Sequence, residues 1–224
     1  MATTKLVLFD IDHTLVDPGG IGRYSVTRAF SELFSVKDAF SGIKMAGRTD
    51  IQIVKEALSA HRISSGNGII PMILNRYLEI LERQTDKIRI KPGVAGLLGH
   101  LESTEGFYPG LLTGNISQGA RIKLAALNLN RHFPFGAFGD DHEDRNELLP
   151  IAVDKFRMMT GMDVAFRDCI VIGDTPHDVQ CATAWGAISI AVSTGPYSYE
   201  SLMETEADYV VSDLREAGKL RLLV

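Results

Sequence analysis

The chain has 224 residues, enough for one large domain or for a core domain with a smaller insert. Hydrophobic residues make up 45% and charged residues 23% of it, as in ordinary soluble proteins. The net charge of -5 gives no excess of basic residues of the kind that binds nucleic acid, so we expect no nucleic-acid partner. The chain also lacks an apolar run long enough to span a bilayer and a signal-peptide pattern at its start, so we expect no membrane association and a cytoplasmic protein. Cys169 and Cys181 are then expected to be buried, reduced thiols.

The residues from Leu6 to Phe9 are all apolar and run directly into Asp10, the pattern of a buried strand that ends in a site. Asp12 follows two residues later, so in an extended chain both carboxylates leave on the same face. Two close carboxylates repel, and their burial requires a cation or a shared proton. The oxygen ligands suit Mg²⁺. The alternative is a simple turn after a strand, with Asp12 or Thr14 as a local cap.

A turn-rich break at residues 16–20 separates this stretch from a region with a different pattern. From Ile21 to about Gln84, apolar residues recur at helical spacing and no strand is evident. This predicts a small all-helical insert, with a flexible loop at residues 64–68.

After a second break at residues 91–93, strands and helices alternate. We predict helices over residues 94–101, 116–127, 146–159 and 178–185, the second capped by Asn115 or Ser117 and the last two stopped by Gly161 and Gly186. Short apolar strands are predicted over residues 110–113, 135–138, 169–173, 187–192 and 208–211. Such alternation is typical of an α/β fold with a parallel sheet and right-handed crossovers.

Polar residues follow three of these strands, at Asp10, at Thr113 and at Asp174, and sites in parallel sheets gather at the carboxyl ends of strands. The Thr113 hydroxyl and the backbone N–H groups of Gly114 and Asn115 could hold phosphoryl oxygens, although a plain helix cap has the same sequence. Asp174 is a candidate metal ligand. Asp178 could hold a metal-bound water or the loop itself, or could serve only the helix dipole.

Asp10 is the candidate nucleophile, because a carboxylate can attack phosphorus and form an aspartyl-phosphate. Asp12 is the candidate general acid, which would protonate the leaving alkoxide and later accept a proton from water. A cation would screen the approach of the two anions.

The order D-x-D-x-T, a strand ending in Thr113, a basic residue and G-D-x-x-x-D resembles the haloacid dehalogenase superfamily of phosphohydrolases, over essentially the whole chain. The helical insert and the Lys91-Pro92-Gly93-Val94 segment resemble the phosphoglycolate phosphatase and beta-phosphoglucomutase branch. The resemblance implies a Rossmann-like core of residues 1–16 and 90–224, a helical cap of residues 17–89 and a Mg²⁺ cofactor. It also implies that Asp10 and Asp174 ligate the metal by their side chains and Asp12 by its backbone carbonyl.

The sequence departs from the pattern of this family at two positions. The third motif normally carries a Lys, and here Arg145 is the candidate replacement, with Lys155 as a fallback; Arg145 could instead only pair with its acidic neighbours. His13 stands where the family more often has Gly, and we assign it no chemical role.

In the predicted cap, Lys44 and Arg48 could meet an anionic leaving group, or could lie on a solvated face. The segment over residues 42–49 nearly spells a phosphate-binding loop, but Arg48 stands where Lys is required and no buried strand precedes it.

The leading prediction is a Mg²⁺-dependent phosphatase acting on a small phosphorylated metabolite. A sugar-phosphate mutase is disfavoured because no His lies between His13 and His61, where mutases of this branch carry one. Asp12 argues against a dehalogenase. A catalytically silent binding protein on the same fold is disfavoured by the complete aspartate and threonine set. The sequence indicates neither the substrate nor the oligomeric state.

Overall fold

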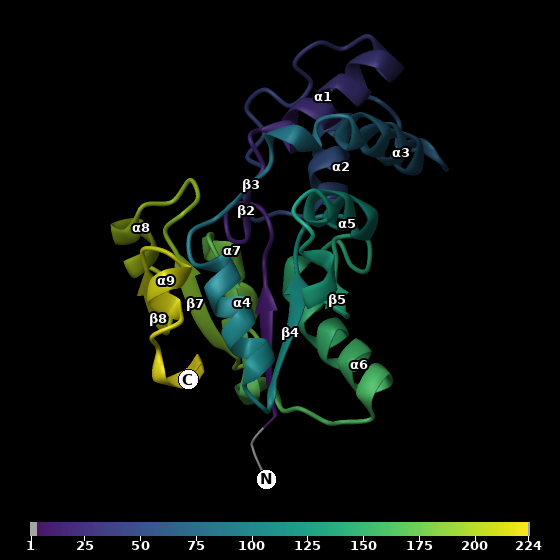
Figure 1. Ribbon diagram of the computed structural model, residues 1–224. Coiled ribbons are helices and arrows are strands. Elements are labelled where there is room, and N and C mark those ends of the chain that lie inside the picture. The colour runs from purple at the N-terminus through teal and green to yellow at the C-terminus, as the bar shows by residue number, and fades with distance from the viewer. Residues whose placement is uncertain (1–3, 224) are drawn as a thin grey trace.

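The computed structural model of the protein describes residues 4–223. Its centre is a six-stranded parallel sheet in the order β5-β4-β1-β6-β7-β8 (Figure 1). The strands are β1 (Lys5–Phe9), β4 (Phe107–Leu112), β5 (Gly136–Ala137), β6 (Cys169–Gly173), β7 (Ile188–Val192) and β8 (Tyr209–Val211). All six were predicted, and the α/β fold class with a Rossmann-like parallel sheet is confirmed.

Strand β1 lies at the middle of the sheet and is buried on both faces, which explains its unbroken apolar sequence. Val7 and Phe9 belong to the core on one face, and Leu6 and Leu8 to the core on the other. The first face is covered by α4 (Val94–Ser103), α5 (Ser117–Ala125) and α9 (Leu214–Ala217), and the second by α6 (Leu148–Thr160) and α7 (Pro176–Thr183). A short helix, α8 (Tyr199–Met203), lies near the edge strand β8.

The helix ends agree with most of the sequence signals. Gly161 and Gly186 adopt the left-handed conformation at φ 75° and 69°, as a helix-ending glycine does. The cap predicted for the helix over residues 116–127 is wrong, because Ile116 occupies the N-cap position and no side chain caps it. Cys169 and Cys181 are buried and unpaired.

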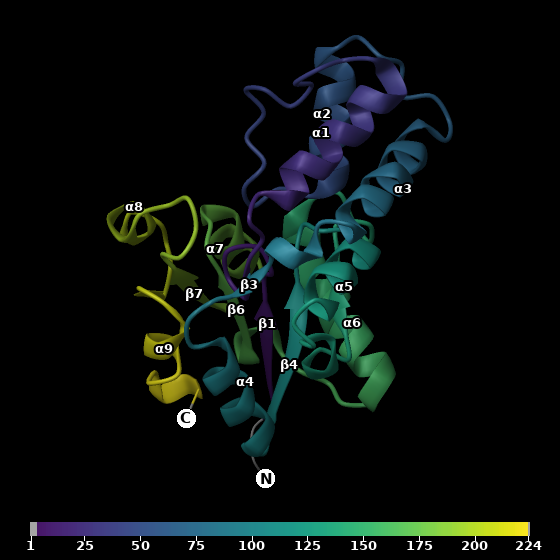
Figure 2. The ribbon, with the colours of Figure 1, turned by 45° about the horizontal axis from the view of Figure 1, so that its top comes forward.

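The predicted helical insert forms three helices, α1 (Ile21–Phe34), α2 (Asp50–Ala60) and α3 (Ile69–Glu82), which pack together beyond the carboxyl ends of the sheet strands (Figure 2). Their shared core contains Phe30, Val54 and Leu81, all fully buried. The chain enters the insert through β2 (Val16–Asp17) and leaves it near β3 (Arg89–Ile90), and these two strands pair antiparallel. This small sheet was not predicted.

Short 3₁₀ turns connect several elements, at Thr85–Lys87, Asn130–His132, Arg145–Glu147, Phe166–Asp168 and Arg221–Leu223. Among residues 4–223, none of the helices combines the length and apolar character that crossing a membrane requires.

Candidate active site

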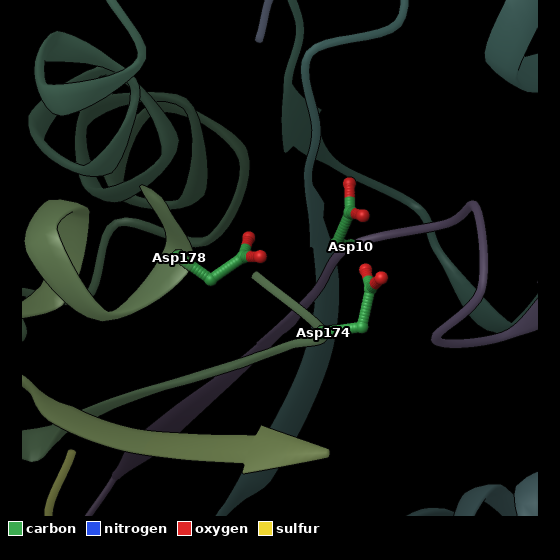
Figure 3. A group of neighbouring side chains, drawn as sticks. All are labelled: Asp10, Asp174 and Asp178. Carbon is green, nitrogen blue, oxygen red and sulfur yellow. The ribbon is translucent and has the colours of Figure 1, made fainter. Parts of the chain in front are cut away.

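Three buried aspartates meet at the carboxyl edge of the sheet. Asp10 follows β1, Asp174 follows β6, and Asp178 lies in the first turn of α7. One carboxylate oxygen from each lies within 4.8 Å of the others. Figure 3 shows the carboxylates of Asp10 and Asp174 side by side, with Asp178 directed toward them from α7. The strand order explains this meeting, because β1 and β6 are neighbours in the sheet.

The electrostatics of this cluster require positive charge. Burial raises the pKa of Asp10 to about 6, with Asp178 and Asp12 adding to the rise and Arg145 opposing it. Burial and the neighbouring Asp10 also hold the pKa of Asp174 well above its usual range. Each carboxylate is therefore held in its charged form only at a cost that a bound cation would remove.

The donor set fits a hard divalent cation. Asp174 Oδ1 accepts a hydrogen bond of 3.4 Å from the Thr14 hydroxyl, whereas Asp174 Oδ2 is buried without a hydrogen-bond partner among residues 4–223. Asp12 Oδ1 is likewise buried and unpartnered in the same described part of the chain. Unsatisfied carboxylate oxygens beside Asp10 are what an oxygen-liganded ion such as Mg²⁺ would satisfy.

Asp178 differs from the other two carboxylates because both of its oxygens already have partners. Its Oδ2 accepts hydrogen bonds from the Thr175 N–H at 3.0 Å and the Thr175 hydroxyl at 2.8 Å, which forms a capping box at the start of α7. Its Oδ1 accepts from Arg145. These contacts fix the loop after β6 and the position of Arg145, so we expect Asp178 to support the site rather than to ligate a metal directly.

Arg145 lies within the aspartate cluster and is only 5% exposed. Its Nη2 contacts Asp178 and lies 3.1 Å from Asp10 Oδ1, while Nη1 donates a 3.1 Å hydrogen bond to the Gly47 carbonyl. Lys155, the fallback for this role, instead contacts Asp141 at 2.5 Å and the Gly136 carbonyl at 3.1 Å. Of these two residues, Arg145 alone is positioned to act beside Asp10.

Asp12 belongs to a second polar network, which includes a lysine that the sequence did not single out. Lys123 on α5 is 2% exposed, and its Nζ lies 2.5 Å from Asp12 Oδ2 and 2.6 Å from Asn115 Oδ1. The Asn115 amide donates to Asp12 Oδ2 at 3.1 Å and to the Thr113 hydroxyl at 2.9 Å. Burial alone would raise the pKa of Asp12, but Lys123 and Asn115 hold that pKa below its usual value.

Lys123 could have been found in the sequence from its spacing. It lies eight residues after Asn115, about two helical turns, and so on the same face of the predicted helix. Its significance depends on Asp12, more than a hundred residues away along the chain, and helical periodicity gives no information on that contact.

The segment between β4 and α5 departs in part from the expected phosphate-binding loop. Thr113 is buried beside Asp10 and lowers its pKa through a hydrogen bond. The N–H groups at the start of α5 are already occupied, since Ile116 donates to Asp50 at 2.9 Å and Ser117 donates to Asp140 at 2.8 Å. The Asn115 N–H also donates to the Thr113 hydroxyl, at 3.3 Å, so the phosphate-binding role predicted for Thr113, Gly114 and Asn115 requires Asn115 to exchange this bond for one to the phosphate.

The insert closes over this edge of the sheet. The Asp50 N–H donates to the Gly114 carbonyl at 2.8 Å, and the Thr49 hydroxyl donates to the Glu143 carbonyl at 2.8 Å. A Cβ atom at Gly114 would lie 2.2 Å from the Arg48 carbonyl oxygen, so only glycine permits this close approach.

A cavity of about 530 Å³ lies between the insert and the sheet edge. Asp10, Asp12, Arg145 and Asp174 line its floor, and all three insert helices contribute to the opposite side. Lys44 and Arg48 both line the cavity. Lys44 is exposed, whereas Arg48 is paired with Glu56.

His13 occupies a left-handed backbone conformation at φ 63°, which glycine adopts more readily. Its carbonyl accepts a 2.6 Å hydrogen bond from Thr194, and burial lowers the pKa of its imidazole. The preference for Gly at this position is thus explained by the turn between Asp12 and β2, which needs a positive φ.

Comparison with known proteins agrees with the fold. Residues 7–192 match the family model described as "Haloacid dehalogenase-like hydrolase". The chain is 26% identical over 215 residues to a phosphoglycolate phosphatase of Pseudomonas savastanoi, an alignment covering 95% of this chain and 78% of that protein. It is also 26% identical over 220 residues to a phosphoglycolate phosphatase of Chromobacterium violaceum, covering 95% and 94% of the two chains.

Two solved structures share the architecture. CbbY from Rhodobacter sphaeroides, crystallised with phosphate, superposes with a TM-score of 0.78 at 16% identity and covers 99% of both chains. A hydrolase from Pseudomonas syringae gives a TM-score of 0.70 at 22% identity, over 95% and 94% of the two chains. At these identities the likeness concerns the fold alone.

The family match covers the aspartates after β1, the Thr113 segment, Arg145 and the loop after β6. The prediction of a phosphatase is confirmed at the level of family and enzyme class: the chain belongs to the haloacid dehalogenase-like hydrolase family.

Proposed function

We propose that the protein is a Mg²⁺-dependent phosphatase that hydrolyses a small phosphate monoester through an aspartyl-phosphate on Asp10. The observation that carries this proposal is the meeting of Asp10, Arg145 and Asp174 at the floor of the cavity. Phosphoryl transfer depends mainly on positioning and on charge stabilisation, and this floor offers a nucleophile, a guanidinium and an unsatisfied carboxylate oxygen.

Mg²⁺ would be held by the side chains of Asp10 and Asp174 and by the backbone carbonyl of Asp12. When bound, it would screen the charge of the attacking carboxylate from the phosphoryl oxygens. Arg145 would hold phosphoryl oxygens from the opposite side, together with the Thr113 hydroxyl and the polar groups of Gly114 and Asn115.

The reaction would proceed in two displacements. Asp10 attacks phosphorus while the ester oxygen leaves and takes a proton from Asp12. Asp12 then accepts a proton from water, which hydrolyses the acyl phosphate and restores Asp10. Because Lys123 and Asn115 stabilise ionised Asp12, the resting enzyme favours the base form, and the first proton can enter with the substrate phosphate, whose second pKa is about 6.

The domain division follows from the same proposal. Residues 1–16 and 90–224 would form the catalytic core, and residues 17–89 the cap that selects the leaving group, with the β2–β3 pair as the connection. The relatives named phosphoglycolate phosphatase support a small phosphorylated metabolite as substrate. We propose the cytoplasm as the place of the reaction.

The test is Asp10→Asn, which keeps the shape of the side chain and removes the nucleophile. We expect turnover of para-nitrophenyl phosphate with Mg²⁺ to fall at least 10³-fold, on the scale of losing a covalent catalytic group, while the circular dichroism spectrum stays unchanged. Asp141→Asn, a change at an aspartate that pairs with Lys155 outside the site, is the control. Turnover by Asp10→Asn near the wild-type rate would remove Asp10 as the nucleophile.

A further inference from the structure

The end of the cavity that faces the insert is apolar. Val26 from α1 and Leu74 from α3 line it together with side chains of α2, so each insert helix adds an apolar surface. The apolar or aromatic residues on this side are Val26, Met45, Ile53, Val54, Leu74 and Tyr77. The polar and charged floor beside Asp10 thus faces an apolar wall, which favours apolar groups of a ligand over charged ones.

The cavity exceeds the needs of a two-carbon phosphate. At about 30 Å³ for each water-sized group, the nine non-hydrogen atoms of phosphoglycolate occupy no more than about 270 Å³. The cavity holds about 530 Å³, and Mg²⁺ with three waters would take roughly another 120 Å³. About a quarter of the space would then stay unfilled against the apolar wall, where ordered water finds few partners.

The charged groups at the inner end do not suit a second anion. Lys123 is paired with Asp12, and Arg48 with Glu56. Arg23 uses Nη1 and Nη2 on the carbonyls of Phe40 and Ile43. Lys44 and Arg23 line the cavity without an ion-pair partner among residues 4–223, but both are exposed, so water screens their attraction for a second anion.

The carboxylate of Asp50 also lines the cavity. Burial raises the pKa of Asp50 to about 6, so it is charged at neutral pH and repels a carboxylate on the substrate. The inner end therefore favours a neutral, carbon-rich group over the carboxylate of phosphoglycolate.

We propose that the alcohol released by this enzyme carries an apolar body of four or more carbons, which packs against the side chains of Val26, Ile53 and Leu74. This inference rests on the proposed phosphatase function and names its substrate class: monoesters with an alkyl or aryl leaving group, in place of a short carboxylated one.

The first experiment measures binding of phosphonates, which carry a P–C bond in place of the ester and are not hydrolysed. Dissociation constants of methyl-, propyl-, butyl- and pentylphosphonate are measured by calorimetry with wild-type protein and Mg²⁺, beside 3-phosphonopropionate, the methylene analogue of phosphoglycolate. Each added methylene buries apolar surface, so we expect the dissociation constant to fall about threefold to fourfold per methylene. Pentylphosphonate should then bind at least tenfold more tightly than 3-phosphonopropionate.

The second experiment fills the cavity by Gly22→Leu. Gly22 lies in the first turn of α1 and lines the cavity, and a Cβ there meets only the Lys123 Nζ at 3.6 Å, an ordinary contact. We expect the ratio of methyl- to pentylphosphonate dissociation constants to fall at least fivefold. Gly96→Leu is the matched control, because Gly96 lies on the exposed face of α4 with open space around its Cβ position and does not line the cavity.

The possible outcomes distinguish this inference from the proposed phosphatase function on which it rests. If para-nitrophenyl phosphate is hydrolysed but 3-phosphonopropionate binds as tightly as pentylphosphonate, the inference of an apolar leaving group is wrong, whereas the proposed phosphatase function is supported. An unchanged chain-length ratio in Gly22→Leu would also overturn the inference. If no phosphonate binds and no aryl phosphate is hydrolysed, both the function and the inference fail.

Discussion

At the scale of single residues, the contacts of Arg145 support the proposal that it serves where the resemblance predicts a lysine. Its forked guanidinium contacts Asp10 and Asp178 through Nη2 and reaches the Gly47 carbonyl of the insert through Nη1. A lysine carries a single ammonium group on a flexible side chain and could not contact the aspartates and the Gly47 carbonyl at the same time. Arg145 thus joins Asp10 to the segment of the insert that covers it.

Substitution of Arg145 by Ala removes both the positive charge and the guanidinium group, whereas substitution by Lys keeps the charge and removes only the guanidinium geometry. We expect Arg145→Ala to weaken binding of inorganic phosphate by about 1.5–3 kcal/mol, because a charge-assisted hydrogen bond is lost. Arg145→Lys should lose less, about 0.5–1.5 kcal/mol, since the charge beside Asp10 remains while the neutral bond to Gly47 is lost. Calorimetric titration with phosphate and Mg²⁺ measures both, and an unchanged affinity in Arg145→Ala would exclude it from phosphate binding.

Lys123 gives a second prediction at this scale. Because Lys123 lowers the pKa of Asp12, Lys123→Met should raise that pKa. With Mg²⁺ present to keep Asp10 ionised, the acidic limb of the kcat/KM profile should then move toward higher pH. The base form of Asp12 would then be lost at pH values where the wild type retains it. The pH profile with para-nitrophenyl phosphate measures the shift.

Lys155→Met is the control for this shift, since Lys155 pairs with Asp141 outside the cavity. Its profile should match the wild type. A fall in rate without displacement of the acidic limb in Lys123→Met would show a purely structural role for the lysine.

At the scale of secondary-structure elements, what could be predicted depended on the apolar run around an element: even the two-residue strand β5 was predicted, from the apolar stretch over residues 135–138. Strand β1 was predicted correctly because several consecutive apolar residues can only be buried on both faces. The two-residue strands β2 and β3 are too short for any periodicity and exist only because the chain enters and leaves the insert side by side. Asp50 was missed for a related reason, since its bond to Ile116 joins parts of the chain that are far apart in sequence.

Asp50 at the start of α2 makes the stability of the insert–sheet contact pH-dependent. The folded pKa, about 6, is above the unfolded value near 3.8, so the folded state holds an extra proton between these values. Stability from this group is complete below about pH 4 and is lost as the pH rises through about 6. Asp50→Asn keeps an oxygen to accept the Ile116 N–H and removes the charge.

We therefore expect Asp50→Asn to be more stable than wild type at pH 7.5, by about 2 kcal/mol, a value reduced because the carboxylate borders the cavity. The difference should fall to about a third of this value near pH 4.5, because the unfolded carboxylate is still largely ionised there. Urea unfolding at both pH values measures it, with EDTA present throughout. A difference that is independent of pH would exclude Asp50 as its source.

At the scale of the whole molecule, an acidic chain concentrates its cations where an anion must enter. The net charge is -5, yet Arg145 and Lys123 are both buried beneath the cavity, next to Asp10 and Asp12. The sheet gathers these groups from β1, α5 and the turn before α6, and the insert then closes over them. Sequence motifs predicted which strand ends would meet, whereas the lining of the cavity depended on how three amphipathic helices pack.

The same convergence of carboxylates predicts how Mg²⁺ should act on the stability of the whole chain. At pH 7.5, 10 mM Mg²⁺ at about ten times its dissociation constant should stabilise the fold by about 1.4 kcal/mol, or raise the melting temperature by about 3–6 °C for a chain of this size. Protons compete for Asp10, whose pKa lies at about 6, so the increase should be smaller at pH 5.

Asp174→Asn separates metal binding from charge repulsion. It removes a buried carboxylate whose Oδ2 has no hydrogen-bond partner in the described residues, so the metal-free variant should melt above the metal-free wild type at pH 7.5. The same change should abolish the Mg²⁺-dependent increase, because a ligand is lost. Scanning calorimetry with EDTA and with Mg²⁺ tests both effects. A variant that retains the full increase would place the ion away from Asp174, and the pairing of Asp10 with Asp174 would then need another explanation than metal binding.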